Sequence, residues 1–296
     1  MAIETSDRKK FFQRLRKGKG TENDQTEMTF MDHLEALRWH IMRSVIVWII
    51  VAITIFVFID WIYDNIILAP SSESFITYGT LCRFGQWLGV GTSLCMPPVK
   101  IAFQVNEVNG TFTSAINIAM VGGVIIAFPY IFWELWRFIK PALSVKEKKY
   151  ARGSILWVSL CFFAGAAFGY YLLAPFTFNF LATFTLGKSG AIQYRPTIND
   201  YIDSLTNLIL GCGIAFELPI LAYVLAKIGL ITASFLKKYA KYAFVIILVV
   251  AAVITPSPDM TSQIIVSLPL LLLYWISILL VSRVDRQKAK EEKEWS

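Results

Sequence analysis

A single acidic residue interrupts one of the most apolar stretches of this chain. Glu217 lies within residues 211–231, GCGIAFELPILAYVLAKIGLI, and Pro219 follows two residues later. A charged side chain at the centre of a bilayer costs on the order of 3 kcal/mol, so this carboxylate should face a protein crevice, be protonated or pair with a polar group. Pro219 has no N–H for the carbonyl of Ala215, which predicts a kink beside the acid. The two residues indicate a functional polar site at mid-membrane; a protonated glutamate bonded between helices is the structural alternative.

The elements that hold this acid are those of a membrane protein. The 296 residues are 56% hydrophobic and 17% charged, with a mean hydropathy of +0.56, which is too apolar for a soluble globular protein. Each helical span needs about 20 apolar residues. We therefore predict an all-α integral membrane protein with six transmembrane helices, of which the fifth is short: residues 44–62, 113–133, 154–175, 204–226, 242–254 and 264–282.

The distribution of Lys and Arg predicts the orientation of these spans. Alternate segments, beginning with the N-terminal tail, hold 24 of the 28 Lys and Arg residues, and the other segments hold four. The positive-inside rule then places both termini in the cytoplasm. The net charge of +7 lies mostly at that face, beside anionic lipid. Nucleic acid is the weaker partner because no soluble domain is present to bind it.

The segments before the first span differ in character. Residues 1–28 are polar and basic, and we expect a disordered cytoplasmic tail without a cleaved signal peptide. Residues 29–44, TFMDHLEALRWHIMRS, predict an amphipathic helix at the inner membrane surface, with Thr29 and Asp32 at the spacing of a capping box. At 100° per residue, one side of this helix is apolar and the other mostly polar: Phe30, Leu34, Leu37 and Ile41 against Asp32, Glu35, Ala36, Trp39 and Arg43.

The four cysteines divide by their position. Cys161 and Cys212 lie within predicted spans and are expected to pack as apolar side chains. Cys82 and Cys95 lie in the long exported loop, residues 63–111, where an oxidising compartment permits a disulfide. Closing a loop of this size stabilises a protein by ~3 kcal/mol in the chain-entropy model. The sequence has no CxxC or Cys/His spacing typical of a metal site, and we expect no cofactor.

The residue types argue against an enzyme. The two histidines, His33 and His40, both precede the first span, so no span offers a His pair for haem or a Ser–His arrangement for proteolysis. A channel or proton-coupled carrier built on Glu217 is one class of function, although the predicted spans contain neither a second charge at that depth nor internal repeats. A receptor or scaffold that binds other transmembrane helices at this polar site is the other class.

Several long motifs resemble the TatC family, the core subunits of the twin-arginine protein translocase. They cover roughly residues 28–282: MTFMDHLEALRWHI, FPYIFWELWRFIKPALSVKEKKYAR, FGYYLLAPFTFNFLATF, GCGIAFELPILAYVLAKIGLIT and AAVITPSPDMTSQIIVSLPLLLLYWISILL. The resemblance implies a glove-like, concave membrane domain over residues 29–282, with short helices 5 and 6, and a cytoplasmic tail over residues 283–296.

The resemblance also implies a function in the bacterial inner membrane. Such a receptor binds twin-arginine signal peptides of folded precursors at the cytoplasmic face. It assembles small single-span subunits of the TatA and TatB type, and export then uses the proton-motive force. A homo-oligomer within the receptor complex, contact with membrane lipids and the absence of catalysis are further implications. The alternative is a stand-alone proton-coupled secondary transporter that uses Glu217.

Of the two acids that the resemblance implies for signal-peptide binding, this chain matches one position directly and departs from the family at the other. Glu147, flanked by lysines in SVKEKK, occupies the family's signal-binding position, and a solvated surface glutamate is its alternative. Two guanidinium groups need carboxylate partners. Many family members carry an acid where this chain has Ala36, and our hypothesis is that Glu35, with Asp32, supplies the second contact. Arg38 matches a family arginine that orients the acids, or it contacts lipid phosphate.

The remaining assignments concern the membrane interior and the exported side. Glu217 matches a family acid that faces the concave cup and receives polar side chains of partner helices. Asp259 matches an acid of the last exported loop, with a turn-forming role as the alternative. Pro70 and Pro175 match prolines that act through backbone shape, and we expect the third span to break at Pro175. The exported loop is longer than is usual in the family, and Cys82 with Cys95 predicts a disulfide-stapled cap.

Overall fold

The computed structural model describes residues 30–72, 75–87, 89, 103–139, 154–183, 195–255 and 260–295. These residues form a helical protein, and an isolated parallel bridge joins Gln104 to Thr197. The helices, in chain order, are α2 (Phe30–Val57), α3 (Ile59–Ile62), the π-helical η1 (Tyr63–Ile67), η2 (Ala69–Ser71), α4 (Ile76–Trp87), α5 (Gly110–Ile139), α7 (Ser154–Phe168), the π-helical η4 (Gly169–Leu173), α8 (Ala174–Thr183), α9 (Ile198–Ala215), α10 (Leu218–Lys227), α11 (Ala233–Lys238), α12 (Ala240–Ile254) and α13 (Met260–Trp295).

The prediction of an all-α membrane protein is confirmed. Within the described residues, five helical stretches are long and apolar enough to cross a bilayer: Leu34–Val57, Gly110–Ile139, Ile155–Thr183, Ile198–Lys227 and Gln263–Lys290. Helix α12 is apolar but has only 15 residues, in agreement with the short fifth helix predicted from the sequence. The number of six spans, the glove-like shape and the orientation of the termini stay predictions.

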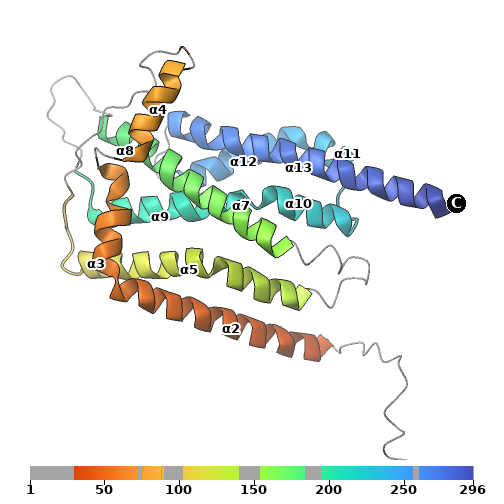
Figure 1. Cartoon of the computed structure of the whole chain (residues 1–296), viewed down its shortest axis with the longest axis horizontal. Helices are drawn as coiled ribbons and strands as arrows, with labels where there is room; N and C mark the ends of the chain where they lie inside the picture. The colour runs from red at the N-terminus through yellow and green to blue at the C-terminus, as the bar shows by residue number, and fades with distance from the viewer. Residues whose placement is uncertain are drawn as a thin grey trace, which may run out of the picture.

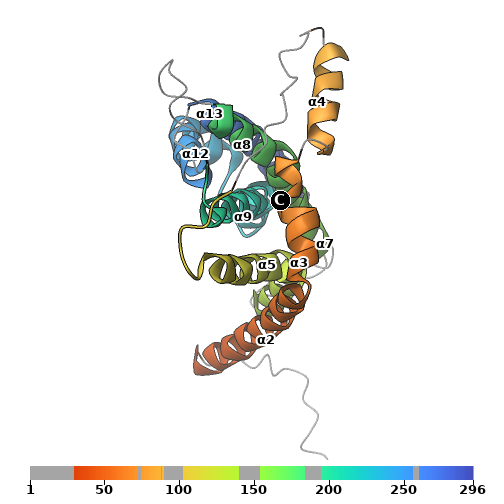
Figure 2. The ribbon, with the colours of Figure 1, turned by 90° about the vertical axis from the view of Figure 1, so that its left-hand side faces the viewer.

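The long helices lie side by side. Figure 1 shows α2, α5, α9 and α13 running roughly along the long axis of the molecule. In the perpendicular view of Figure 2, α2, α5, α9 and α12 follow one another across the molecule. Helix α2 begins, α5 and α10 end and α13 extends outward at the same end of the bundle (Figure 1). We call this the basic end, because Arg137, Lys227, Lys237 and Arg286 lie there.

The first helix differs from the prediction. Instead of a surface helix followed by a separate span, Phe30–Val57 is one helix of 28 residues, which corresponds to about 42 Å at 1.5 Å per residue. The segment contains neither Pro nor Gly, so no residue in it breaks the helix. Leu34 and Ile41 of the predicted apolar stripe are 43% and 53% exposed. Leu34 and Ile41 therefore lie on the outer surface of the bundle.

The last helix also differs from the prediction. A short sixth helix ending near residue 282 is wrong, since α13 has 36 residues and continues to Trp295. The charged residues 283–295, RVDRQKAKEEKEW, contain no Gly or Pro and are mostly good helix formers. The apolar run ends near Ser282, but the backbone has no reason to leave the helix there.

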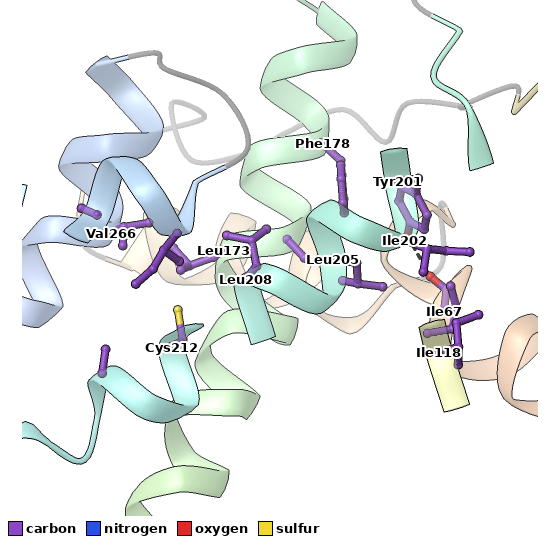
Figure 3. Close-up of a cluster of buried hydrophobic side chains, with 14 of the residues drawn as sticks. Ile67, Ile118, Leu173, Phe178, Tyr201, Ile202, Leu205, Leu208, Cys212 and Val266 are labelled. Atoms are coloured by element: carbon purple, nitrogen blue, oxygen red, sulfur yellow. Dashed lines mark hydrogen bonds between the residues drawn. The ribbon is translucent and has the colours of Figure 1, made fainter. Parts of the chain in front are cut away.

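Helix α9 lies at the centre of the buried core. Its side chains Ile202, Leu205 and Leu208 are fully buried, and Figure 3 shows them among Leu173, Phe178 and Val266 from other helices. The contact between α7 and α9 depends on glycine. A Cβ atom at Gly165 would lie 2.4 Å from the carbonyl oxygen of Cys212, so the two backbones approach as small-residue contacts in membranes allow.

Candidate functional site

Glu217 lies where the fourth long span is interrupted. Helix α9 ends at Ala215, Phe216 and Glu217 form a turn, and α10 begins at Leu218. Pro219 is the second residue of α10 and is buried, and its missing N–H leaves the carbonyl of Ala215 without the usual donor. Within the turn, the Glu217 N–H donates to the carbonyl of Ile214, three residues earlier, at 3.1 Å. The predicted kink is confirmed as a break of the helix at the acid itself.

The carboxylate of Glu217 is only partly enclosed. The residue is half-buried, and its Oε1 atom is buried without a hydrogen-bond partner among the described residues. The Glu217 carboxylate lies beside the main chain of Phe162 on α7, and it is close enough to interact electrostatically with the Cys161 thiol. A buried acceptor without a donor is costly. The site can therefore accept a hydrogen bond from a group that the described residues do not supply.

A second buried carboxylate was missed by the sequence analysis. Glu134 on α5 lies within the candidate span Gly110–Ile139 and is 1% exposed. The expectation that Glu217 is the only charged group at membrane depth is therefore wrong. The sequence pattern that pointed to Glu217, an acid within an apolar helix, is also present around Glu134 in the segment FPYIFWELWRFI. The predicted span ended at residue 133 and excluded it.

Glu134 joins the first two long helices near the basic end. His40 Nδ1 of α2 lies 2.5 Å from Glu134 Oε2. The Tyr130 hydroxyl donates to Oε1 at 3.0 Å, and Arg137 Nη1 is 3.8 Å from the same oxygen. Arg137 also lies 5.2 Å from the ring centre of Trp133. Both carboxylate oxygens are thus satisfied, as a buried charge requires.

The predicted signal-peptide residues are described only in part. Glu35 and Arg38 are exposed on the first turns of α2. The backbone of Asp32 belongs to the same helix, but its side chain lies outside the described part, as do Glu147, Asp259 and Cys95 entirely. Ala36 precedes His40 by one helical turn and shares its face. The structure therefore places Glu35 beside the α2 face that contacts Glu134. Because Glu147 lies outside the described residues, its position relative to Glu35 stays a prediction.

The prolines at the opposite end of the bundle act through backbone groups. Pro70 is buried in η2, and its carbonyl accepts a hydrogen bond of 3.0 Å from the Tyr78 hydroxyl of α4. Burial raises the pKa of Tyr78, which keeps the hydroxyl protonated as the donor. Pro175 cannot donate to the carbonyl of Tyr171, and Thr77 Oγ1 of α4 donates to that oxygen at 2.5 Å.

Pro175 does not end the third span as predicted. The helical path continues through Pro175 to Thr183, and the irregular part precedes it as the π-helical turn Gly169–Leu173. This π turn ends two residues before Pro175, next to the carbonyl of Tyr171 that the proline cannot satisfy. The expected break is wrong, whereas the effect of Pro175 on backbone hydrogen bonding is present.

The cysteines follow the predicted division as far as they are described. Cys82 on α4 is disulfide-bonded, and Cys161 and Cys212 are free thiols. Because Cys95 lies outside the described residues, the pairing of Cys82 with Cys95 stays a prediction. Within the described residues, no group of three or more His, Cys, Asp or Glu side chains is arranged to hold a metal ion.

These features define a class: a multi-span helical membrane protein with a carboxylate at a broken helix and a buried polar cluster between its first long helices. The profile of the family described as Sec-independent protein translocase protein (TatC) matches residues 32–269. The chain belongs to the TatC family, and it is a multi-pass protein of the bacterial inner membrane and a component of the Sec-independent protein translocase.

Known relatives and solved structures agree with this assignment. The TatC protein of Blattabacterium sp. subsp. Periplaneta americana is 39% identical over 268 residues, which cover 90% of this chain and all of that protein. The TatC protein of Helicobacter pylori strain J99 is 44% identical over 64% of this chain and 75% of the relative. A crystal structure titled as the twin arginine translocase receptor TatC is 31% identical, covers 86% of this chain and 99% of its own, and superposes with a TM-score of 0.66.

Proposed function

We propose that this protein is the receptor and scaffold of twin-arginine translocation. It binds twin-arginine signal peptides of folded precursors at its basic end, which faces the cytoplasm, and it assembles single-span subunits of the TatA and TatB type. Export then draws on the proton-motive force. The observation that carries this proposal is Glu217, a half-buried acid at a helix break whose Oε1 atom lacks a hydrogen-bond donor.

The basic end supports binding of the signal peptide. Glu35 is exposed where α2 begins, and a guanidinium group can reach its carboxylate from water. Glu147 is proposed as the principal acid, and Asp32 as a further contact. Arg38 is exposed on the same helix, three residues after Glu35, so the two side chains are neighbours on the helix surface. It is proposed to hold the acids in place before the arginine pair arrives.

The Glu217 site supports assembly with partner helices. A polar side chain from a membrane-spanning partner would supply the missing donor to Oε1 and remove the cost of an unsatisfied acceptor. In lipid such interhelical hydrogen bonds contribute modestly, about 1 kcal/mol, so the site favours reversible assembly. The structural residues Pro70, Pro175 and Asp259, and a Cys82–Cys95 disulfide, are proposed to shape the exported rim.

A proton-coupled carrier is the alternative function. Glu217 alone would then bind and release protons while the protein moved a small solute. The second buried carboxylate, Glu134, is tied to His40, Tyr130 and Arg137 and lies on other helices. Ion flux by the purified protein alone, reconstituted without partner subunits, would favour the carrier.

Photo-crosslinking tests the receptor directly. A photoreactive residue at position 35 or 147 is expected to capture a twin-arginine precursor, and one at position 217 a co-expressed single-span subunit. Position 39 is the control for position 35, because Trp39 is 53% exposed and lies one turn further along α2. Position 221 is the control for 217, because Leu221 is 56% exposed and lies one turn into α10. Equal capture from control and test positions would refute site-specific binding.

A further inference from the structure

Helix α11 is held in one orientation by α13. The Asp285 Oδ2 atom accepts a hydrogen bond of 2.8 Å from the N–H of Ala233, the first residue of α11. Further along, the Tyr274 hydroxyl donates to the carbonyl of Leu236 at 2.8 Å. A small apolar cluster supports these bonds: Ala226, Ala233, Val281 and Val284. The outward face of α11 is therefore presented in a fixed position at the basic end.

A row of aromatic rings runs from this face into the next helix. Phe235 is on α11, Tyr239 joins α11 to α12, and Tyr242 is in the first turn of α12. The ring centres of Phe235 and Tyr239 are 4.6 Å apart, and those of Tyr239 and Tyr242 are 6.0 Å apart. The three side chains are 49%, 41% and 56% exposed. Neighbouring rings that remain this exposed form a surface without a partner among the described residues.

Lysines border the row of rings. Lys237, Lys238 and Lys241 are all exposed. The Lys238 Nζ atom lies 5.9 Å from the ring centre of Tyr239, and Lys241 Nζ lies 5.1 Å from that of Tyr242. In the described part of the chain no carboxylate forms an ion pair with these lysines. The surface thus has a strong positive charge that the described residues do not neutralise.

The position of this surface in the bundle indicates where it lies relative to the membrane. It follows the candidate span Ile198–Lys227 and leads directly into the apolar helix α12. The side of α12 that holds Tyr242 continues with exposed apolar side chains, among them Ile246 at 61% and Val249 at 58%. In a membrane, hydrocarbon or the apolar side of another helix covers such a face. The rings then lie at the boundary between hydrocarbon and headgroups, where Tyr and Trp are enriched.

We propose that Phe235, Lys237, Lys238, Tyr239, Lys241 and Tyr242, the α11 surface, bind the headgroups of anionic phospholipids. The lysine ammonium groups pair with lipid phosphates, the tyrosine hydroxyls donate to phosphate or glycerol oxygens, and the rings pack on the upper acyl chain. Continuity with the apolar face of α12 favours a lipid over an acidic protein segment, because a soluble segment would leave that junction uncovered. The inference is independent of how signal peptides or partner helices bind.

The test is lipid binding by the full chain in detergent, measured by native mass spectrometry with phosphatidylglycerol and with phosphatidylcholine. We expect tighter binding of phosphatidylglycerol to the native protein. Each lysine near an anionic headgroup contributes about a fivefold factor. Changing Lys237, Lys238 and Lys241 to Gln should therefore abolish the preference for the anionic lipid, whereas changing all three to Arg should preserve it.

A matched control removes the same charge elsewhere. The variant Arg283→Gln/Arg286→Gln/Lys290→Gln neutralises three exposed cations on the extension of α13 and is expected to keep the preference. Equal loss in this control, or an unchanged preference after the lysine-to-Gln changes, would overturn the proposal. The proposal would also be overturned if the three lysines proved necessary for binding an acidic protein but not for binding phosphatidylglycerol. The thermal unfolding midpoint of each variant shows that the changes act on binding and not on folding.

Discussion

The imidazole of His40 and the carboxylate of Glu134 link the first two long helices across 94 residues of sequence, with Nδ1 2.5 Å from Oε2. The carboxylate is almost completely buried, and Tyr130 and Arg137 contact its other oxygen. A buried polar pair of this kind adds little net stability, but removing one partner leaves an uncompensated polar group and is costly. This pair therefore fixes the position of α2 against α5 near the basic end, where Glu35 is exposed.

We predict that Glu134→Ala lowers the free energy of unfolding by about 3 kcal/mol. The variant leaves His40 and the Tyr130 hydroxyl without their common acceptor, whereas Glu134→Gln keeps an acceptor oxygen and should cost less. Unfolding in mixed detergent micelles, followed by circular dichroism, measures the difference. Leu135→Ala is the control, because that neighbouring side chain is 46% exposed. Additive losses in a His40→Ala/Glu134→Ala double mutant would contradict direct coupling.

Glu35→Gln should reduce export of a twin-arginine precursor. A hydrogen bond to a charged group contributes about 1.5–3 kcal/mol, so loss of the arginine contact is expected to weaken signal-peptide binding by about tenfold or more. The measurement compares export rates of Glu35→Gln, Glu147→Gln and the control Glu107→Gln, whose exposed acid precedes α5 at the opposite end. Normal export by Glu35→Gln, together with a defect in Glu147→Gln, would show that Glu35 does not replace the acid absent at Ala36.

Gly165→Ala should destabilise the protein and disturb the Glu217 site. A Cβ atom at Gly165 would meet the Cys212 carbonyl at 2.4 Å and the Phe216 side chain at 2.8 Å, next to the helix break. Overpacking of this kind costs about 1–3 kcal/mol. Gly79→Ala is the control, since nothing lies within 4 Å of its added Cβ atom, and it should be neutral. Similar unfolding midpoints for the two variants would show that α7 and α9 separate without cost.

The contrast between Glu217 and Glu134 shows what the sequence could predict. The break at Glu217 follows from Pro219, whose missing N–H acts within one turn, so local sequence was sufficient. The pairing of Glu134 with His40 depends on two helices meeting at one register, and nothing local specifies it. Hydropathy also misplaced the end of α13 at residue 282, because contacts of Asp285 and Lys288 with α11 and α10 support the polar extension.

Asp285→Ala should loosen α11 without affecting the core. The Asp285 carboxylate caps the N-terminus of α11 through the Ala233 N–H, and loss of such a cap costs about 1 kcal/mol. Hydrogen exchange of residues 233–236 is therefore expected to accelerate about fivefold. Arg286→Ala, which removes an exposed neighbour on α13, should leave this exchange unchanged. Unchanged exchange in Asp285→Ala would show that Tyr274 and the apolar cluster suffice to hold α11.

The bond from Thr77 to Tyr171 gives a prediction in which one substitution compensates for another. Thr77 Oγ1 donates to the Tyr171 carbonyl, which Pro175 cannot satisfy because it has no N–H. Thr77→Val should therefore cost about 1–2 kcal/mol of unfolding free energy in the native background. In a Pro175→Ala background the restored N–H can donate to the same carbonyl, so Thr77→Val should cost clearly less.

A double-mutant cycle of unfolding free energies measures this coupling. Thr80→Val is the matched control, since the Thr80 hydroxyl donates to the carbonyl of Ile76 within α4 itself and does not reach Tyr171. Its cost should be the same with Pro175 or with Ala at that position. If Thr77→Val costs the same in both backgrounds, the hydroxyl does not substitute for the N–H that Pro175 lacks, and α4 is held to the third span by its aromatic contacts, such as the stacking of Phe75 on Tyr171.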